Sequence, residues 1–251
     1  MTSIILRGCN GRMGQEITKL LKADEQAAIV AGIDLNETTD KGYPVFTSFI
    51  ACNVIADVII DFSSPEKLDE MLAYAEKNQV SIVLCTTGLS EEDLNMVHKA
   101  SQNIAILRSA NMSVGINTVI KLLQTAAQVL AAADFDIEIV EKHHNQKVDA
   151  PSGTALALAD AMNKVLKGEY DYNFDRSKER KKREQKEIGI SAVRGGTIVG
   201  EHEVIFAGTD EVIEIKHTAY SRAIFAKGAI HAAKFLAGKV PGMYQMSDVI
   251  G

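Results

Sequence analysis

Short apolar runs alternate with amphipathic segments through the first part of the chain, as far as Arg108. The apolar runs are rich in Ile and Val and predict buried strands at Ser3–Arg7, Ala27–Asp34, Asp57–Phe62, Ser81–Cys85 and Ile104–Arg108. Amphipathic segments between several of them predict helices at Gln15–Lys22, Pro65–Asn78 and Glu91–Ser101. Strands that alternate with helices indicate a doubly wound parallel sheet.

Two of these helices have recognisable starts. Ser63 and Ser64 precede a proline, and Ser90 precedes three acidic residues. Serine oxygens accept hydrogen bonds from the free N–H groups of a first turn, where proline and acidic residues are also favoured. We therefore expect these serines to cap the two helices.

After Asn111 the pattern changes. It predicts a long helix at Ile116–Ala132, a strand at Asp136–Lys142, a helix at Thr154–Lys167, and strands at Ile188–Val193, Glu201–Phe206 and Glu211–Lys216. Glycine-containing turns join the last three strands, which indicates a mixed or antiparallel sheet in a second, α+β domain. A final helix, Arg222–Ala237, returns to the first domain. The predicted α/β fold therefore has a Rossmann-like domain, 1–114 completed by 218–251, and a second domain, 115–217.

Composition narrows the class of protein. The 251 residues carry a formal net charge of −6, which argues against general binding to nucleic acid or anionic membranes. No apolar run approaches the roughly 18 to 20 residues that span a bilayer, and the N-terminus lacks the pattern of a secretory signal. Cys9, Cys52 and Cys85 show no CxxC spacing, which disfavours a disulfide framework and a zinc knuckle. We expect a cytoplasmic protein that binds neither nucleic acid nor membranes.

One segment, Arg176–Glu187, holds seven basic and three acidic residues. Charge runs of this kind usually form solvated loops or helix faces. We expect this one to bind no ligand.

A glycine-rich segment, Gly8-Cys9-Asn10-Gly11-Arg12-Met13-Gly14, follows the first strand and opens the first helix. Gly8 permits a tight turn, Gly11 lets the backbone approach a pyrophosphate, and Gly14 allows close packing of helix and strand. The helix N-terminus then offers N–H groups and a partial positive charge to phosphates. The spacing is GxxGxxG rather than the commoner GxGxxG, and the alternative is a glycine turn without a ligand.

Asp34 ends the second predicted strand, twenty residues after Gly14. An acidic side chain at this place accepts hydrogen bonds from an adenosine ribose; the alternative is a solvated turn aspartate. Its charge opposes the extra phosphate of NADP, and Leu35 offers no compensating charge, although Arg12 is a candidate. We therefore expect NADH to be used at least as well as NADPH.

Two further strand ends carry small and polar residues. They are Cys85-Thr86-Thr87-Gly88 and Ser109-Ala110-Asn111-Met112. Ligands of doubly wound sheets bind at the carboxyl ends of the strands. Each segment alone is as consistent with a plain turn, but together with the glycine loop they favour a crevice for the nicotinamide ring and ribose.

The densest chemistry lies at Glu141–Thr154. His143 and His144 exchange protons near neutral pH, and Lys147 donates a proton or anchors a carboxylate. Neighbouring side chains of an extended segment point to opposite faces, which predicts different tasks for the two histidines. For either histidine alone the alternative is a packed or surface imidazole. The spacing of the histidines and Asp149 differs from the usual zinc pattern, so no metal site is expected.

Pro151-Ser152-Gly153-Thr154 starts the next predicted helix. Its hydroxyl and free N–H groups make an anion site, and a simple helix cap is the alternative. A cationic cluster beside an anion-binding turn, after a dinucleotide-binding fold, predicts an enzyme that reduces a small dianionic molecule.

These motifs resemble the dihydrodipicolinate reductase family of the diaminopimelate route to lysine. The matching blocks are Gly8–Gly14, Thr86–Gly88, Asn111–Asn117, Glu141–Thr154, Arg194–His202, Ser221-Arg222 and Gly242–Val249, which span nearly the whole chain. The block from His143 to Thr154 is highly specific. Asn145 and Gln146 stand where some members carry basic residues, and so does Leu35.

The resemblance implies a role for each matched position. His143 is the implied acid/base residue and Lys147 the proton donor. His144, Lys147, Gly153 and Thr154 are the implied contacts to the carboxylates of a small dicarboxylate substrate. The implied contacts to NADH or NADPH are Gly8, Cys9, Asn10, Gly11, Arg12, Met13, Asp34, Cys85, Thr86, Thr87, Ser109, Ala110, Asn111 and Met112. The family further implies a homotetramer built through the sheet of the second domain, with hinge closure between the domains.

The implied reaction is the reduction of 4-hydroxy-tetrahydrodipicolinate by a nicotinamide cofactor. Two rival functions stay open on the residues alone. One is another two-domain dehydrogenase, such as one acting on an amino-dicarboxylate like aspartate, which shares the glycine loop but does not require the whole motif from His143 to Thr154. The other is a redox-sensing or scaffold protein that binds NAD without turnover.

Overall fold

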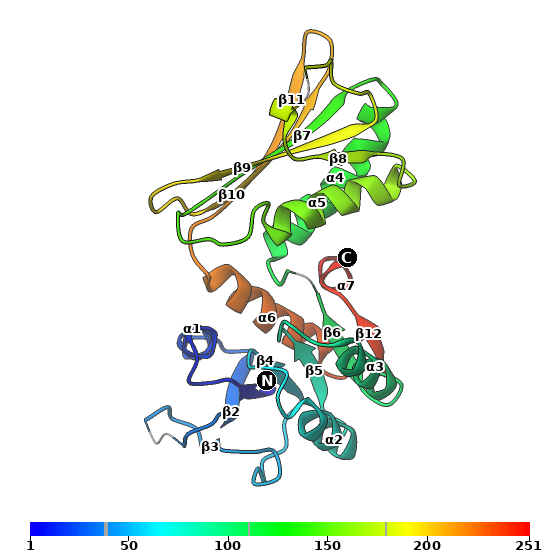
Figure 1. The fold of residues 1–251 in the computed structure, drawn as a ribbon. Helices are drawn as coiled ribbons and strands as arrows, with labels where there is room; N and C mark the ends of the chain where they lie inside the picture. The colour runs from blue at the N-terminus through cyan, green and yellow to red at the C-terminus, as the bar shows by residue number, and fades with distance from the viewer. Residues whose placement is uncertain (38–39, 110, 179) are drawn as a thin grey trace. The chain divides into compact units, whose positions relative to one another are not determined.

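The computed structural model describes residues 1–37, 40–109, 111–178 and 180–251, and these form two compact units. Unit 1 comprises Met1–Val114 and Arg222–Gly251, and unit 2 comprises Gly115–Ser221 (Figure 1). The expected second boundary, between residues 217 and 218, falls too early. The last strand of unit 2 continues to Ala219, so that unit ends only beyond it.

Unit 1 is built on a parallel sheet of seven strands with the order β12-β6-β5-β4-β1-β2-β3. The strands are β1 (Thr2–Arg7), β2 (Ala27–Ile33), β3 (Val45–Phe46), β4 (Val58–Asp61), β5 (Ser81–Leu84), β6 (Ala105–Arg108) and β12 (Gly242–Tyr244). Every neighbouring pair is parallel, as the alternation of strands and helices predicts. The short strands β3 and β12, at the two edges, were not predicted.

Helices cover both faces of this sheet because consecutive side chains of a strand point to opposite sides. They are α1 (Arg12–Leu21), α2 (Leu68–Asn78), α3 (Glu91–Ala100), α6 (Ala223–Leu236) and the short α7 (Met246–Ile250). Ile4 of β1 lies in a core with α1 and α6, whereas Ile5 lies in a second core with α2 and α3. Lys234 of α6 fastens the returning chain through a 2.6 Å ion pair with Asp24.

The two expected helix caps have different outcomes. Ser90 caps α3: its hydroxyl accepts from the Asp93 N–H at 3.1 Å, and the Asp93 carboxylate accepts from the Ser90 N–H at 2.8 Å. The expected cap at Ser63 and Ser64 is wrong, because α2 begins only at Leu68 and has no side-chain cap. The Ser63 N–H instead donates to the Asp61 carboxylate at 3.1 Å.

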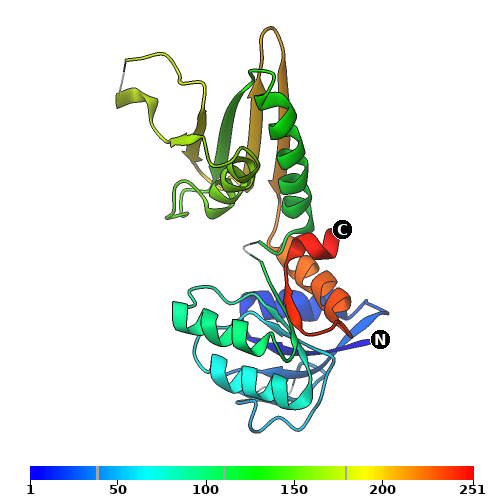
Figure 2. The ribbon, with the colours of Figure 1, turned by 90° about the vertical axis from the view of Figure 1, so that its right-hand side faces the viewer.

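Unit 2 contains a five-stranded mixed sheet with the order β11-β10-β7-β9-β8. Its strands are β7 (Asp136–His143), β8 (Asp171–Asn173), β9 (Glu187–Arg194), β10 (Gly200–Ala207) and β11 (Val212–Ala219), and its helices are α4 (Val114–Ala131) and α5 (Gly153–Val165). Strand β10 pairs antiparallel with β7 and β11, while β9 pairs parallel with β7 and β8. Both helices pack on one face of the sheet, and Figure 2 shows α4 running along its strands.

Helix α4 corrects the expectation that no apolar run approaches the length that spans a bilayer. It has 18 residues with a mean hydropathy of 1.2, so by length and composition alone it is long and apolar enough to cross a membrane. Leu123 and Ala127 bury one side of it in the core of unit 2. Leu122 and Val129, on other sides, are exposed.

Most described residues of the basic segment after β8 are exposed, as expected of a solvated loop, but two of its arginines bind strand β7. Arg183 donates to Asp136 at 2.7 Å, to Glu138 at 3.0 Å and to the Ile137 carbonyl at 3.0 Å, all on β7. Arg176, in the 3₁₀ turn Arg176–Lys178, also pairs with Glu138. Strand β7 carries acidic side chains on the face away from the helices, and the arginines of the charge run bind there.

Candidate active site

The glycine loop of unit 1 has the close contacts that a dinucleotide cradle requires. Gly8 has φ +80°, and a Cβ atom there would lie 2.5 Å from the Phe62 carbonyl oxygen. A Cβ atom on Gly14 would lie 2.2 Å from the Gly8 carbonyl oxygen. Gly11 is the N-cap of α1 and supplies no side-chain cap, and the first turn of α1 holds no acidic residue. The first N–H groups and the positive end of α1 therefore suit a phosphate group.

Strand register brings the other predicted cofactor residues to the same edge of the sheet. Arg7 pairs with both Ile33 and Asp61, and Asp61 pairs with Leu84, which pairs with Arg108. The segments that follow these level strand ends begin at Gly8, Asp34, Phe62, Cys85 and Ser109, so the structure brings them together. Ala110 lies outside the described residues.

Asp34 is held against the glycine loop. Its carboxylate accepts hydrogen bonds from the N–H groups of Asn10 and Leu35, each at 2.8 Å. A carboxylate has about four acceptor positions, so each oxygen retains capacity for a ribose hydroxyl. Lys41 Nζ lies at the same loop, 2.9 Å from the carbonyl oxygen of Cys9. Sequence reasoning missed this lysine, because it lies on the chain segment between β2 and β3, where no motif marks it.

A buried polar network fixes the strand-end loops after β4 and β5. The Thr86 hydroxyl donates to Asp61 at 2.7 Å, and Arg7 pairs with the same carboxylate at 3.1 Å. Burial raises the pKa of Asp61, and the Arg7 charge and these hydrogen bonds only partly offset it. The Thr86 side chain is thus engaged inside the protein. This leaves Thr87 and the backbone of the loop as the groups that face outward.

Of the two cysteines at this edge, Cys9 is buried and Cys85 is partly buried, and both are thiols rather than reactive thiolates. Burial, followed by the charge of Asp34, raises the pKa of Cys9 to about 11. Burial and the charge of Asp61 raise the pKa of Cys85 well above its ordinary value. Both side chains therefore contribute shape to the predicted crevice.

Unit 2 holds the reactive motif on one face of its sheet. Ile137, Ile139, Glu141 and His143 alternate along β7, and the first three are fully buried. His143 Nδ1 lies 2.6 Å from Glu141 Oε2. The guanidinium group of Arg194, paired in register with His143, donates to both Glu141 oxygens at 2.7 Å.

Further bonds to Glu141 keep its carboxylate ionised. The N–H of Ser152 donates to Glu141 Oε1 at 2.9 Å. Burial acts to raise the pKa of Glu141, but the hydrogen bonds from Arg194, His143 and Ser152 outweigh it and hold the pKa below its ordinary value. The carboxylate remains charged at neutral pH.

A second buried histidine, His202, lies beside this cluster. It pairs in register with Glu141, and its ring centroid is 5.1 Å from that of His143. Its Nε2 atom shares a 2.8 Å hydrogen bond with the hydroxyl of Ser152, which caps α5 by accepting from the Ala155 N–H. Burial, and next the neighbouring His143, lower the pKa of His202 from 6.5 to about 4. His202 is therefore neutral at physiological pH.

The loop between β7 and α5 carries Lys147. Its Nζ atom donates to Asp149 at 2.7 Å. This bond is the largest cause that holds the pKa of Asp149 below its ordinary value, followed by the N–H of Asp149 itself, the charge of Lys147 and the N–H of Gly153. The predicted substrate contacts Lys147 and Gly153 thus converge on one carboxylate. His144 lies just beyond the end of β7, and its carbonyl oxygen accepts from the Lys147 N–H at 3.2 Å.

Sequence reasoning assigned no role to Glu141, Arg194 or His202. For Ser152 it left open an anion site or a simple helix cap, and the structure shows the cap. The sequence held one signal. Glu141 on β7 and His202 on β10 each lie on a strand face that is otherwise mostly apolar. A charged side chain on such a face requires a buried partner. Among the described residues no cluster of three or more His, Cys, Asp or Glu side chains is arranged to hold a metal ion.

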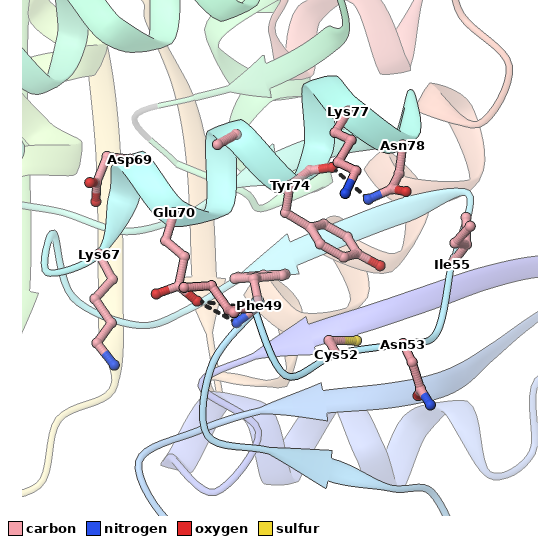
Figure 3. A pocket seen from close by; sticks show the side chains of 12 residues that line it. Phe49, Cys52, Asn53, Ile55, Lys67, Asp69, Glu70, Tyr74, Lys77 and Asn78 are labelled. Carbon is pink, nitrogen blue, oxygen red and sulfur yellow. Dashed lines mark hydrogen bonds between the residues drawn. The ribbon is translucent and has the colours of Figure 1, made fainter.

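A cavity of about 720 Å³ elsewhere in unit 1 contains none of the predicted site residues. It lies between α2 and the segment that precedes β4 (Figure 3). Glu70, on its wall, accepts hydrogen bonds from the N–H groups of Phe49 and Ile50 and so holds that segment in place. We assign this cavity no role in the chemistry.

Solved structures with the same architecture bind or act on small molecules. A dipicolinate-bound dihydrodipicolinate reductase from Paenisporosarcina sp. TG-14 has a TM-score of 0.82 at 24% identity, over 98% of this chain and 97% of that one. An aspartate dehydrogenase from Thermotoga maritima has a TM-score of 0.52 at 12% identity, over 96% of this chain and 98% of that one. These likenesses establish the fold. With the glycine cradle, they define a two-domain protein with a dinucleotide-binding fold.

The chain belongs to the dihydrodipicolinate reductase family. The family models for the N-terminus and the C-terminus of dihydrodipicolinate reductase match residues 2–112 and 115–250. The 4-hydroxy-tetrahydrodipicolinate reductase of Caldanaerobacter subterraneus subsp. tengcongensis is 52% identical over 100% of this chain and 98% of its own length. The protein of the same name from Clostridium novyi is 50% identical over the same shares. The resemblance inferred from the motifs is confirmed.

Proposed function

We propose that this chain reduces 4-hydroxy-tetrahydrodipicolinate to tetrahydrodipicolinate in the diaminopimelate route to lysine. The observation that carries the proposal is the match, over the full length of the chain, to relatives named for this activity. The clustered acid/base and cationic groups of unit 2 support it. So does the glycine cradle of unit 1, which fits the pyrophosphate of a dinucleotide.

Loss of the 4-hydroxyl group and a hydrogen of the neighbouring ring carbon as water gives a conjugated imine, to which a hydride and a proton are added. A nicotinamide cofactor held by the glycine loop would supply the hydride, to ring carbon C4. Electrons then move through the conjugated imine toward the neighbouring carbon, which must be protonated. His143, through Nε2, or Lys147, through Nζ, supplies this proton. The positive charge of Lys147 also stabilises the negative charge that develops on the ring.

Selection of a dianion follows from the same groups. Lys147, His144 and the first N–H groups of α5, at Gly153 and Thr154, bind the two substrate carboxylates. The dipicolinate bound to the Paenisporosarcina relative is a planar dicarboxylate. It is therefore a suitable non-reacting probe for this site.

The chain accepts both nicotinamide cofactors and uses NADH at least as well as NADPH. Asp34 supports the use of NADH, because its carboxylate suits ribose hydroxyls and repels a phosphate group. Lys41 and Arg12 supply the positive charge that makes NADPH acceptable. The contact of Lys41 with the glycine loop supports this part of the proposal.

The active form is a cytoplasmic homotetramer that binds neither nucleic acid nor membranes. Subunits associate through the face of the unit 2 sheet that α4 and α5 leave uncovered. Ion pairs cross this face, including Lys216 with Glu201 at 2.8 Å and Lys142 with Glu201 at 3.6 Å. Light scattering of the purified protein tests the mass, and a monomer at assay concentrations would contradict it.

One assay separates the proposal from its two rivals. Purified protein is mixed with NADH and the aldolase product of pyruvate and aspartate semialdehyde, and the absorbance of NADH is followed. Oxidation of NADH that depends on the aldolase product supports the proposed reaction. Oxidation only with another substrate, such as the iminium form of oxaloacetate, favours an amino-dicarboxylate dehydrogenase. Tight NADH binding with no turnover on either substrate favours a sensor.

A further inference from the structure

The Glu141 carboxylate has every acceptor position occupied by the protein. Oε2 accepts from His143 Nδ1 at 2.6 Å and from Arg194 at 2.7 Å. Oε1 accepts from Arg194 at 2.7 Å and from the Ser152 N–H at 2.9 Å. A carboxylate offers about four such positions, so this one is held in a single orientation and has none left for a ligand.

This arrangement determines which nitrogen of His143 exchanges protons. An ionised carboxylate only accepts hydrogen bonds, so Nδ1 must carry the hydrogen that lies between His143 and Glu141. Nε2 is then the nitrogen that takes up and releases a proton. Gly200 lies beside it: a Cβ atom there would be 3.2 Å from His143 Nε2. The missing side chain leaves space at the atom that must react.

Arg194 compensates the charge of Glu141. A lone carboxylate at 0% exposure would be strongly destabilising, and its charge would act on the imidazole without compensation. The bidentate guanidinium neutralises it and fixes its plane. His202, whose ring centroid is 5.1 Å from that of His143, is neutral and adds no charge beside it.

We infer that Glu141 is the positioning residue for His143, and that Arg194 and the Ser152 N–H hold Glu141 in place for that task. The inference rests on the proposed acid/base role of His143 and adds a residue that does not itself touch the substrate. The alternative is a structural ion pair that merely joins β7, β9 and the start of α5. A positioning role predicts a fixed tautomer of His143 and lower turnover when Glu141 is changed. A structural ion pair predicts a change in stability alone.

Nitrogen-15 NMR of the intact protein, labelled at histidine, tests the tautomer directly. The His143 signals are assigned by their loss in His143→Gln. We expect the neutral imidazole to carry its hydrogen on Nδ1. A hydrogen on Nε2 would overturn the inference. This readout needs no substrate, so it is decided separately from the proposed reaction.

Glu141→Gln tests the consequence for turnover. The glutamine oxygen keeps one Arg194 N–H and the Ser152 N–H as donors. Its NH₂ group then faces His143, which favours the opposite tautomer, and the second Arg194 bond is lost. We expect kcat to fall by roughly 10² or more, with KM changed less than about threefold. Glu76→Gln is the matched control, because Glu76 lies on α2 of unit 1, outside the unit 2 site, and accepts a 2.8 Å hydrogen bond from Asn103 that a glutamine oxygen also accepts. Its kcat should stay at the wild-type value.

Three results would overturn the inference: wild-type kcat in folded Glu141→Gln, a loss confined to KM, or an equal loss of kcat in Glu76→Gln. If Glu141→Gln fails to fold, the tautomer of the wild-type protein decides the question alone. Absence of turnover in the wild-type protein would remove the proposed reaction. The tautomer measurement would still test whether Glu141 positions His143.

Discussion

Lys147 Nζ donates a 2.7 Å hydrogen bond to Asp149 Oδ1, so the lysine proposed to bind the substrate is already paired with a carboxylate of its own loop. The Asp149 side chain is 50% exposed and can be displaced. It holds Lys147 near the N-terminus of α5, in the place where a substrate carboxylate is proposed to bind. Substrate binding then exchanges one carboxylate for another.

The Asp149 carboxylate competes with the substrate for Lys147, so removing its charge should strengthen the binding of dicarboxylates. We expect Asp149→Asn to lower the Kd for dipicolinate by about two- to fivefold, because exposed ion pairs contribute only about 0.2 to 1 kcal/mol. Isothermal titration calorimetry measures the change. Asp210→Asn is the control, since Asp210 has φ +62°, which asparagine tolerates, in the turn between β10 and β11. Weaker binding in Asp149→Asn alone would show that Asp149 organises the site instead.

Lys147 itself should be required for turnover. We expect Lys147→Ala to reduce kcat by at least about 10²-fold, which is the usual contribution of a general acid. Steady-state kinetics measures it, with Lys164→Ala on the exposed side of α5 as the control. Near-normal turnover in Lys147→Ala would remove the lysine from the proton transfer.

Gly200 should be sensitive to the smallest added side chain. An alanine Cβ atom would lie 3.2 Å from His143 Nε2, so the methyl group would displace the imidazole or cover the reacting nitrogen. We expect Gly200→Ala to lower kcat by roughly tenfold while the melting temperature changes little. Gly195→Ala is the control, because its Cβ atom would meet only Ile198, at an ordinary 3.6 Å. Equal losses in both variants would contradict this account of Gly200.

His202 should make the protein less stable in mild acid. Burial first, and then His143, lower its pKa from 6.5 to about 4, so between these values the unfolded chain binds a proton that the folded chain does not. Its contribution to stability is full above pH 6.5 and is lost as the pH falls toward 4, by roughly 3 kcal/mol in all. His202→Asn should reduce the difference in unfolding free energy between neutral pH and pH 4, measured with urea. An unchanged difference would contradict the prediction.

Lys41 should matter more for NADPH than for NADH. Its Nζ atom binds the glycine loop at Cys9, and we expect Lys41→Met to lower kcat/KM for NADPH by about tenfold, with a smaller effect on NADH. Lys77→Met, on the exposed side of α2, is the control. Equal effects on both cofactors would exclude a phosphate contact.

A wild-type preference for NADPH of about tenfold or more would contradict the role given to Asp34.

Local periodicity predicted the main helices and strands because each is long enough to show its period. Strands β3, β8 and β12 have two or three residues, which is too short for alternation to show. The expected cap at Ser63 and Ser64 failed although the deciding contacts are close in the sequence. The Asp61 carboxylate accepts from the Ser63 N–H two residues along the chain, and α2 begins only at Leu68.

The candidate site shows a division between local and long-range information. His143, Lys147, Gly153 and Thr154 were named because they share one continuous motif. Arg194 lies 53 residues beyond its partner Glu141, and His202 lies 50 residues beyond Ser152. Such partners depend on strand register, which local spacing does not contain. A glutamate on an apolar strand face was the one readable sign that a buried partner existed.

The register of β7, β9 and β10 has a consequence for how the activity arises during folding. Side chains of a strand alternate between faces, so a slip of β9 by a single residue would turn Arg194 away from Glu141. A slip of β10 would likewise turn His202 away from Ser152. A misregistered chain would keep its hydrogen-bonded sheet yet lose the oriented imidazole. Catalytic competence is therefore a stricter reporter of correct strand pairing than secondary-structure content.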